Sequence, residues 1–297
     1  MSRSSSPDSL TGFVNFSKPA DMTSSDAVCI VRGALSKVIG GRQKAGHLGT
    51  LDPLAEGVLP IALGRATALF DFLAFKTKTY IARFVFGSTT DTLDRGGKFS
   101  AQKNGRVPTA EEIKSVLSKF TGEIMQVPPA YSAKSVEGRR AYDYARKGVE
   151  VSLPAKKVTV HSLSLTGEDE HGYIFEITCG GGTYIRALAR DIAAELGTVG
   201  YMSALTRTSS GPFTLADAVS VEDFRRDPAG CIIPAEYALA GLERAELDTE
   251  AEKRILNGIP LKGEWQEGEY AAVYGENGGL LGLGRADSRG LRLYVRL

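Results

Sequence analysis

The sequence predicts a protein that mixes helices and strands, with one large domain and a small all-β unit at its C-terminal end. Apolar residues between positions 27 and 38 recur at helical spacing, whereas residues 80 to 86 alternate as a strand does. After residue 245 the chain changes to short apolar runs separated by glycine-rich turns, which is typical of small β units. With 297 residues the chain is long enough to bury a substantial core.

Composition limits the classes of function. Lysine plus arginine (36) nearly equal aspartate plus glutamate (35), so any site for a polyanion must be a local patch. The three cysteines are far apart and lack CxxC spacing, which disfavours a disulfide framework or a zinc site and favours a reducing compartment. No apolar run is long enough to span a bilayer. We therefore expect a cytoplasmic protein without a metal and without a membrane segment.

The chain in order supports this mixture of elements. Phe13 to Phe16 reads as a strand, and Thr23 with Asp26 forms a capping box before the first helix, which Gly40 ends. Further elements follow the same rules: strands at 58–63, 78–86, 158–160 and 173–179, helices at 66–75, 109–120 and 185–196, and, after 245, a helix at 249–256 and strands at 270–274, 280–283 and 291–297.

The segment from Gly46 to Pro60 is the candidate catalytic loop. Its three glycines and two prolines exclude a regular helix, and Pro53 restricts the backbone of Asp52 to extended angles. A carboxylate on a stiff loop beside a buried strand is a candidate catalytic group, although an aspartate before a proline is more often a turn former. His47 lies in the basic approach to this loop, which is either a solvated turn or a phosphate contact.

Tyr80 follows a lysine at the start of a strand. Most tyrosines in such strands belong to the core. At the edge of the apolar stretch, however, the ring is equally suited to stack on a nucleic-acid base.

A local basic patch lies between residues 126 and 157. Seven lysines and arginines, among them Lys134, Arg139 and Arg146, stand against three acidic residues, and tyrosines are interleaved with them. Cations for phosphates and aromatic rings for bases are what a nucleic-acid clamp requires. An amphipathic surface helix is the equally weighted alternative.

Arg186 lies in the first turn of a predicted helix, after the glycine run 180–182. Cations are disfavoured at a helix N-terminus, so this arginine requires an acidic partner. We predict that the partner is Asp52.

Seven motifs in order resemble the bacterial tRNA pseudouridine-55 synthase family, known as TruB. The resemblance covers nearly the whole chain, and the matching segments are Lys18-Pro19 with Thr23-Ser24, Gly46 to Leu59, Lys78-Thr79-Tyr80, Thr90 to Gly97, Gln126 to Ala133, Gly182 to Arg186, and Leu205 to Phe213.

This resemblance implies an α+β pseudouridine synthase fold, with a mixed, largely antiparallel sheet, flanking helices and a central cleft. It divides the chain into a disordered tail (1–10), a catalytic domain (11–240) with an RNA-binding arm (about 126–157), and a small all-β, PUA-like RNA-binding domain (245–297). The implied reaction isomerises uridine 55 in the T-loop of tRNA to pseudouridine by base flipping. It needs no cofactor, and the expected partner is the T-arm of tRNA, bound by a monomer without an obligate protein partner.

The resemblance also assigns roles to residues. Asp52 is the catalytic carboxylate, which attacks C1′ of the sugar or C6 of the base or removes a ribose proton. Arg186 keeps it ionised, and Tyr80 supplies the stacking platform and a candidate base for the C5 proton. His47 fills or supports the space that the flipped base leaves. RNA contacts are expected from His47, Tyr184, Leu205, Lys134, Arg139 and Arg146.

Two other classes of function stay open at this point. A carboxylate glycosidase also breaks a glycosidic bond, but it normally needs two facing carboxyl groups, with Glu56 or Asp91 as the second. A non-catalytic tRNA-binding chaperone would use the basic arm and the β unit alone.

Overall fold

The structure is a computed structural model of the chain, and it describes residues 10–74, 76–100, 105–131, 135–136, 139–140 and 153–297. Nearly all of the tail expected at 1–10 therefore lies outside the described residues. Within the described part, no helix combines the length and the apolar character needed to cross a membrane.

The described residues of the large domain form a nine-stranded sheet with the central order β1-β3-β10-β4-β9-β8-β5, while β2 pairs with β3 and β11 with β10. Neighbouring strands run antiparallel except for β3 and β10, which are parallel where Thr206 pairs with Glu56. The sheet consists of β1 (Gly12–Lys18), β2 (Ala45–His47), β3 (Glu56–Leu63), β4 (Lys78–Phe86), β5 (Gly122–Gln126), β8 (Lys156–Asp169), β9 (Gly172–Cys179), β10 (Gly200–Ser210) and β11 (Phe213–Thr214). This is the mixed, largely antiparallel sheet that the sequence predicts.

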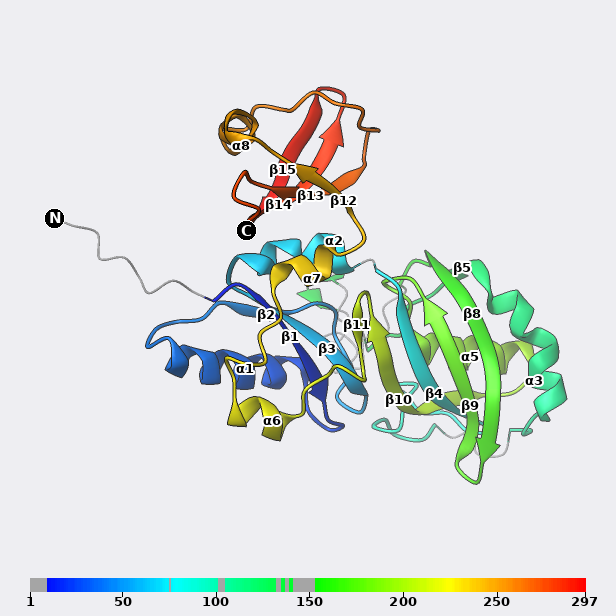
Figure 1. Cartoon of the computed structure of the whole chain (residues 1–297). Coiled ribbons are helices and arrows are strands. Elements are labelled where there is room, and N and C mark those ends of the chain that lie inside the picture. The colour runs from blue at the N-terminus through cyan, green and yellow to red at the C-terminus, as the bar shows by residue number, and fades with distance from the viewer. Residues whose placement is uncertain (1–9, 75, 101–104, 132–134, 137–138, 141–152) are drawn as a thin grey trace.

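Helices cover the two halves of this sheet, with α1 against the β1–β3 half and α5 and α3 on the β4–β8 half (Figure 1). The helices of the described chain are α1 (Ser24–Val38), α2 (Phe70–Ala74), α3 (Ala110–Val116), α5 (Ile185–Glu195), α6 (Val221–Arg226), α7 (Ala235–Leu239) and α8 (Thr249–Leu256), with 3₁₀ turns η1 (Gly64–Leu69) and η2 (Leu117–Phe120). The predicted capping box at Thr23 with Asp26 is confirmed, and a second one, at Thr109 with Glu112, begins the helix predicted from residue 109.

The C-terminal unit is a second, four-stranded sheet of order β12-β13-β14-β15, with α8 beside it. Its strands are β12 (Glu243–Glu246), β13 (Tyr270–Tyr274), β14 (Leu280–Asp287) and β15 (Gly290–Arg296). Outside this unit, β6 (Ser135–Val136) and β7 (Arg139–Arg140) form a two-stranded sheet of their own. The small sheet stands over α2 and α7 (Figure 1). Leu283 and Val295 share one buried apolar cluster with Leu69 and Phe213 of the large domain, so the two units are joined by a continuous core.

Two predicted helices are shorter than expected. The helix predicted for 66–75 is a 3₁₀ turn from Gly64 to Leu69 followed by only five α-helical residues, and the one predicted to reach Phe120 becomes 3₁₀ at Leu117. Short helices tighten readily at their ends, which the apolar spacing does not reveal.

Candidate active site

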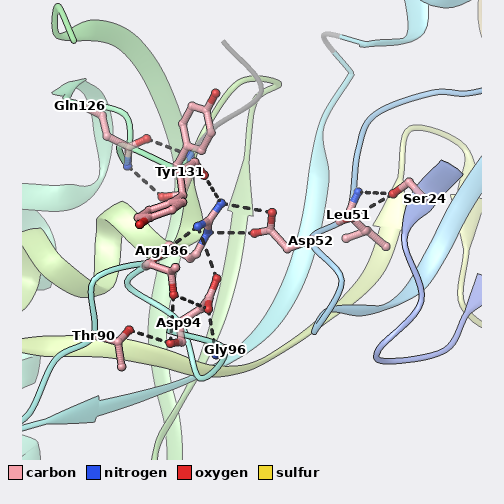
Figure 2. Close-up of polar contacts among 11 residues, drawn as sticks. Ser24, Leu51, Asp52, Thr90, Asp94, Gly96, Gln126, Tyr131 and Arg186 are labelled. Carbon is pink, nitrogen blue, oxygen red and sulfur yellow. Dashed lines mark hydrogen bonds and ion pairs between the residues drawn. The ribbon is translucent and has the colours of Figure 1, made fainter. Parts of the chain in front are cut away.

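The Asp52 loop, which connects β2 to β3, is held from both sides. The hydroxyl of Ser24, the first residue of α1, donates to the carbonyl of Leu51 and accepts from its N–H, both at 2.9 Å (Figure 2). On the other side, the carbonyl of Pro53 accepts from the backbone N–H of Asp21 at 2.7 Å and from Nζ of Lys18 at 3.2 Å. Hydrogen bonds on each side, of which those between Ser24 and Leu51 are buried, therefore fix the backbone that carries Asp52.

Arg207 of β10 supports the start of the same loop. Its guanidinium is 1% exposed and donates to the carbonyls of Val58 at 2.7 Å and Gly49 at 3.2 Å. Gly49 has φ of +113°, a conformation that favours glycine. The glycine thus allows the loop to pass directly over the arginine.

Arg186 joins the loop to helix α5, as the charge argument predicts. Its Nε lies 2.9 Å from Oδ2 of Asp52 and its Nη2 lies 3.2 Å from Oδ1, so the pair is bidentate. The remaining donors reach the carbonyls of Thr92 at 2.9 Å and Tyr131 at 3.0 Å, and the carboxylate of Asp94 at 3.4 Å. All five N–H groups of the guanidinium have partners here, and these contacts offset the free-energy cost of burying the cation.

Asp94 is a second carboxylate on the same cation. Its side chain is 11% exposed, and its Oδ1 accepts from the Thr92 hydroxyl at 2.7 Å and from the Gly96 N–H at 2.9 Å. Asp52 and Asp94 approach the guanidinium from different loops (Figure 2). Arg186 is therefore clamped between two acids that both line the cavity, and Asp52, with a 32% exposed side chain, is more accessible than Asp94, with 11%.

The ionisation of Asp52 is set by opposing effects. Burial raises its pKa above the ordinary value and the charge of Asp94 adds to this, whereas Arg186 and Lys18 oppose the shift. Arg186 thus favours the ionised form, as expected, but burial opposes it more strongly. Asp52 is a more basic carboxylate than one in water, with its counter-charge already in place.

A cavity of about 640 Å³ opens in front of Asp52. That volume is in the range of small-molecule sites. Its walls come from the Asp52 loop, β4, the 92–94 turn, the start of α5 and β10, and they include Asp52, Lys78, Tyr80, Asp94, Tyr131, Tyr184, Arg186, Leu205 and Arg207.

Tyr80 is a buried wall of this cavity and not an exposed ring. It is 7% exposed on the inner face of β4. Burial raises the pKa of its phenol, although Arg207 opposes the shift. The side chain is therefore a neutral phenol at neutral pH, which suits a stacking surface better than a base.

Gln126 and Tyr184 fix the end of the cavity at the start of α5. The Tyr184 N–H donates to Oε1 of Gln126 at 2.8 Å, and Nε2 of Gln126 donates to the Tyr184 carbonyl at 3.1 Å. Gln126 is 1% exposed. Since Arg186 follows Tyr184 by two residues, this pair also sets the position of the arginine (Figure 2).

Comparison with known proteins now decides the family. Residues 37–185 match the TruB family pseudouridylate synthase N-terminal domain, and residues 186–240 match the tRNA pseudouridylate synthase B C-terminal domain. The chain belongs to the TruB family of pseudouridylate synthases.

Its relatives match over most of their length. The chain is 40% identical to the tRNA pseudouridine synthase B of Caldanaerobacter subterraneus subsp. tengcongensis, over 96% of this chain and 98% of the relative. It is 42% identical to that of Caulobacter sp. strain K31, over 87% and 83%. Among solved structures, it matches a chain of a Cbf5-Nop10-Gar1 complex with a TM-score of 0.70 and 26% identity, over 96% of this chain and 84% of that one.

The remaining residues that the TruB resemblance implicates fall into two groups. Leu205, on β10, and Tyr184 line the cavity, and the RNA contacts that the resemblance implies for them stay predictions. His47, at the end of β2, is not among the described residues that line it. Its Nδ1 is buried without a hydrogen-bond partner in the described part of the chain, and burial lowers its pKa, so this imidazole is neutral.

The predicted basic arm is mostly outside the description. Lys134 and Arg146 lie outside the described residues, and only the backbone of Arg139, in β7, is given. Their expected RNA contacts stay predictions.

Sequence reasoning missed two buried cations in the TruB cavity, Lys78 and Arg207. Both appear in matching motifs, but neither was assigned a role. Lys78 is 6% exposed, and burial, followed by the charge of Arg207, lowers its pKa to about 8. The signal available beforehand was its position two residues before Tyr80, which places both side chains on one face of β4.

Proposed function

We propose that this protein converts a uridine of tRNA to pseudouridine with Asp52 as its reacting carboxylate. The observation that carries the proposal is the bidentate Asp52–Arg186 pair on the wall of a cavity of about 640 Å³, a volume that suits a small-molecule-sized group such as a nucleotide. The relatives of the chain are named tRNA pseudouridine synthase B, which supplies the substrate class. The finer assignment, uridine 55 in the T-loop bound by a monomer, is part of the proposal.

The reaction breaks the bond between C1′ and N1 and forms one between C1′ and C5. Atoms balance within the nucleotide, because C5 loses a proton and N1 gains one. The carboxylate acts by attacking C1′ or C6 or by removing a ribose proton, and all three uses need an ionised, accessible Asp52. Arg186 supports each of them, since it supplies the counter-charge and aims both carboxylate oxygens.

The target uridine must leave its stack to reach the cavity. Flipping a base costs about a few kcal/mol, which stacking in the pocket offsets. Tyr80 is the stacking platform, with Leu205 and Tyr184 as further walls. His47 acts outside the cavity, where a neutral imidazole at the end of β2 supports the vacated stack.

The decisive experiment replaces Asp52 by alanine. The variant should lose the release of tritium from C5-labelled tRNA, by a factor of at least about 10⁴, while its Kd for tRNA changes less than about threefold. Glu56→Gln is the matched control, since Glu56 is exposed and accepts from the hydroxyl of Thr206 at 3.0 Å, and it should keep full activity.

The same assay separates the other two classes. Wild-type protein that binds tRNA without tritium release would support the chaperone. Free uracil in the reaction, or loss of activity in Glu56→Gln, would support a glycosidase. Neither Glu56 nor Asp91 is among the described residues that line the cavity. Asp94 does line it, but its carboxylate is held by Arg186, Thr92 and Gly96 and is not free to act as a second catalytic acid, which favours the isomerase.

The site in tRNA is tested separately. Transcripts with uridine 55 replaced by cytidine should give no product, and an isolated T-arm stem–loop should give product. Mapping of pseudouridine at another position would overturn the T-loop assignment while leaving the isomerase proposal intact.

A further inference from the structure

Two buried cations, Lys78 and Arg207, line the cavity from neighbouring strands. Lys78 begins β4 and faces the same way as Tyr80, two residues on, while Arg207 comes from the neighbouring strand β10. Both side chains line the cavity with Asp52. The charges that shift the pKa of Asp52 are those of Arg186, Asp94 and Lys18, so Lys78 and Arg207 form a separate charged region.

Both cations lie close to the turn at Gly49. A Cβ placed on this glycine would lie 3.6 Å from Cε of Lys78 and 3.7 Å from Nη1 of Arg207. Arg207 is anchored by its bonds to two carbonyls, and Nζ of Lys78 donates to the carbonyl of Lys76 at 2.9 Å. The ammonium is therefore held in a fixed place at the wall of the cavity.

The surroundings of Lys78 disfavour its charge. Burial and the nearby Arg207 lower its pKa to about 8. The thiol of Cys179, directly opposite on β9, has its pKa raised by burial to about 11 and stays neutral. A cation in such a place gains interaction energy when an anion forms beside it, and the anion would relieve its repulsion with Arg207.

The proposed reaction forms such an anion. When the C1′–N1 bond breaks with its electron pair on N1, the detached uracil carries a negative charge that spreads over N1, O2 and O4. We propose that Lys78, backed by Arg207, is a catalytic residue that stabilises this uracil anion until C5 bonds to C1′. The inference rests on the proposed function and applies whichever way Asp52 acts.

A purely structural lysine is a poor explanation of the same geometry. Burying an ammonium against an arginine is unfavourable, and an apolar side chain of similar length would fill the space more easily. Lys76 offers a matched comparison within the chain. Its Nζ lies 4.3 Å from the ring centre of Phe72, and it is not among the described residues that line the cavity.

The first test compares Lys78→Met, Lys78→Arg and the control Lys76→Met in single-turnover conversion of tRNA by the full chain. We expect Lys78→Met to slow the chemical step by about 100-fold, as for loss of one preorganised donor, with tRNA binding changed less than about twofold. Lys78→Arg should retain at least a tenth of the rate, and Lys76→Met should match the wild type. Thermal melts establish that each variant is folded. A Lys78→Met enzyme with the wild-type rate would overturn the proposal.

A leaving-group experiment distinguishes stabilisation of the anion from mere positioning. T-arm stem–loops carry either uridine or 5-fluorouridine at the reacting position. Consumption of the starting nucleoside is followed by nuclease digestion and liquid chromatography, because uridine and pseudouridine have the same mass. Fluorine withdraws electrons and stabilises the uracil anion without help, so the defect of Lys78→Met should shrink to less than about 10-fold. Equal defects on both substrates would overturn the proposal. Failure of the wild type to convert the uridine stem–loop would instead refute the proposed function.

The pH profile gives a third readout. Arg207, Cys179, Tyr80 and the Gly49 turn are the groups that face Lys78 from the elements packed around it. Under subsaturating conditions, which report the free enzyme, the wild-type rate should fall above about pH 8 as the ammonium loses its proton. The fall should disappear in Lys78→Arg, because arginine keeps its charge. A fall that persists in Lys78→Arg would count against the proposal.

Discussion

Replacing Arg186 by lysine tests whether the shape of the buried cation, and not only its charge, holds Asp52. The guanidinium makes two contacts to the carboxylate of Asp52, at 2.9 and 3.2 Å, and reaches Thr92, Tyr131 and Asp94 with its other donors. A lysine has three donors on a single nitrogen. It therefore leaves at least two of these five acceptor contacts unmade.

The magnitude follows from the acceptors left behind. Each buried polar group without a partner costs about 1–3 kcal/mol. The side chain of Asp52 is 32% exposed, so water relieves part of this penalty, and about 2–3 kcal/mol in total is a fair estimate. If the loss falls on the transition state, in which Asp52 must be both aimed and ionised, the rate drops by about 30- to 150-fold.

Single-turnover tritium release from C5-labelled tRNA measures this rate, and filter binding measures the affinity. The acid side of the pH profile gives an independent check. The proposed role of Asp52 needs its ionised form, so we expect the rate to fall as the pH drops through its pKa. Because Arg186 lowers that pKa, a poorer substitute should move the fall to higher pH.

The control is Arg190→Lys, one helical turn further along α5 and therefore on the same face of the helix. Arg190 bonds to Asp191 at 2.7 Å and to the carbonyl of Val127 at 2.9 Å, and it is not among the described residues that line the cavity. It should change the rate by less than about threefold. An Arg186→Lys enzyme with both the wild-type rate and the wild-type acid limb would refute the reasoning.

Two other predictions concern the supports of the loop. Ser24→Ala removes both hydrogen bonds to buried Leu51, so we expect the free energy of unfolding to fall by about 1–3 kcal/mol. We also expect a lower kcat with unchanged tRNA affinity. Urea titration and turnover assays check these results, and an unchanged kcat would contradict the prediction. Burial lowers the pKa of Lys18 to about 8. Between about pH 8 and 10.5 the unfolded chain therefore binds more protons than the folded one, so the free energy of unfolding rises with pH through that window. The free energy of unfolding of the wild type, taken relative to that of Lys18→Met, should therefore rise from pH 7.5 to 10, and a constant relative value in denaturant titrations would contradict this.

Local signals in the sequence predict most of the elements around the site. The two capping boxes fix the starts of α1 and α3, because the side chains involved lie within four residues of each other. The strict alternation along β4 predicts its inner face, from Tyr80 to Phe86. These elements depend on neighbours in the chain, so the sequence is sufficient to find them.

Strand β10, in contrast, is central to the sheet and escapes its own pattern. Two register shifts, between Met202 and Ala204 and between Arg207 and Ser209, interrupt the pairing with β4. Each bulge displaces the alternation by one residue, and the exposed and buried positions no longer follow a period of two. Polar residues such as Arg207 and Ser210 are buried as a result, and the sequence pattern does not predict the strand.

The candidate site shows the same division. The Asp52–Arg186 pair is predictable because a cation at a helix N-terminus needs an acid, whatever the distance along the chain. Asp94 is distinguished from Asp91 only by the contact of its turn with Arg186, which no local pattern in the sequence shows. The burial of Lys78 at the start of β4 likewise follows from packing against β9 and β10, which are distant in the chain.

The charges around the cavity are arranged in two regions, of which one is balanced and the other positive. At one end the carboxylates of Asp52 and Asp94 face Arg186, and the charge of Lys18 also acts on Asp52, so the negative and positive charges balance. At the other, Lys78 and Arg207 are both positive and lie close together. A uracil ring on Tyr80, between the two, would experience a field that draws electrons from the sugar bond into the ring. That is the direction in which charge moves when C1′–N1 breaks. Preorganised charges of this kind act without rearrangement during the reaction, so the polarity of the cavity connects the Asp52 pair and the buried lysine to one chemical step.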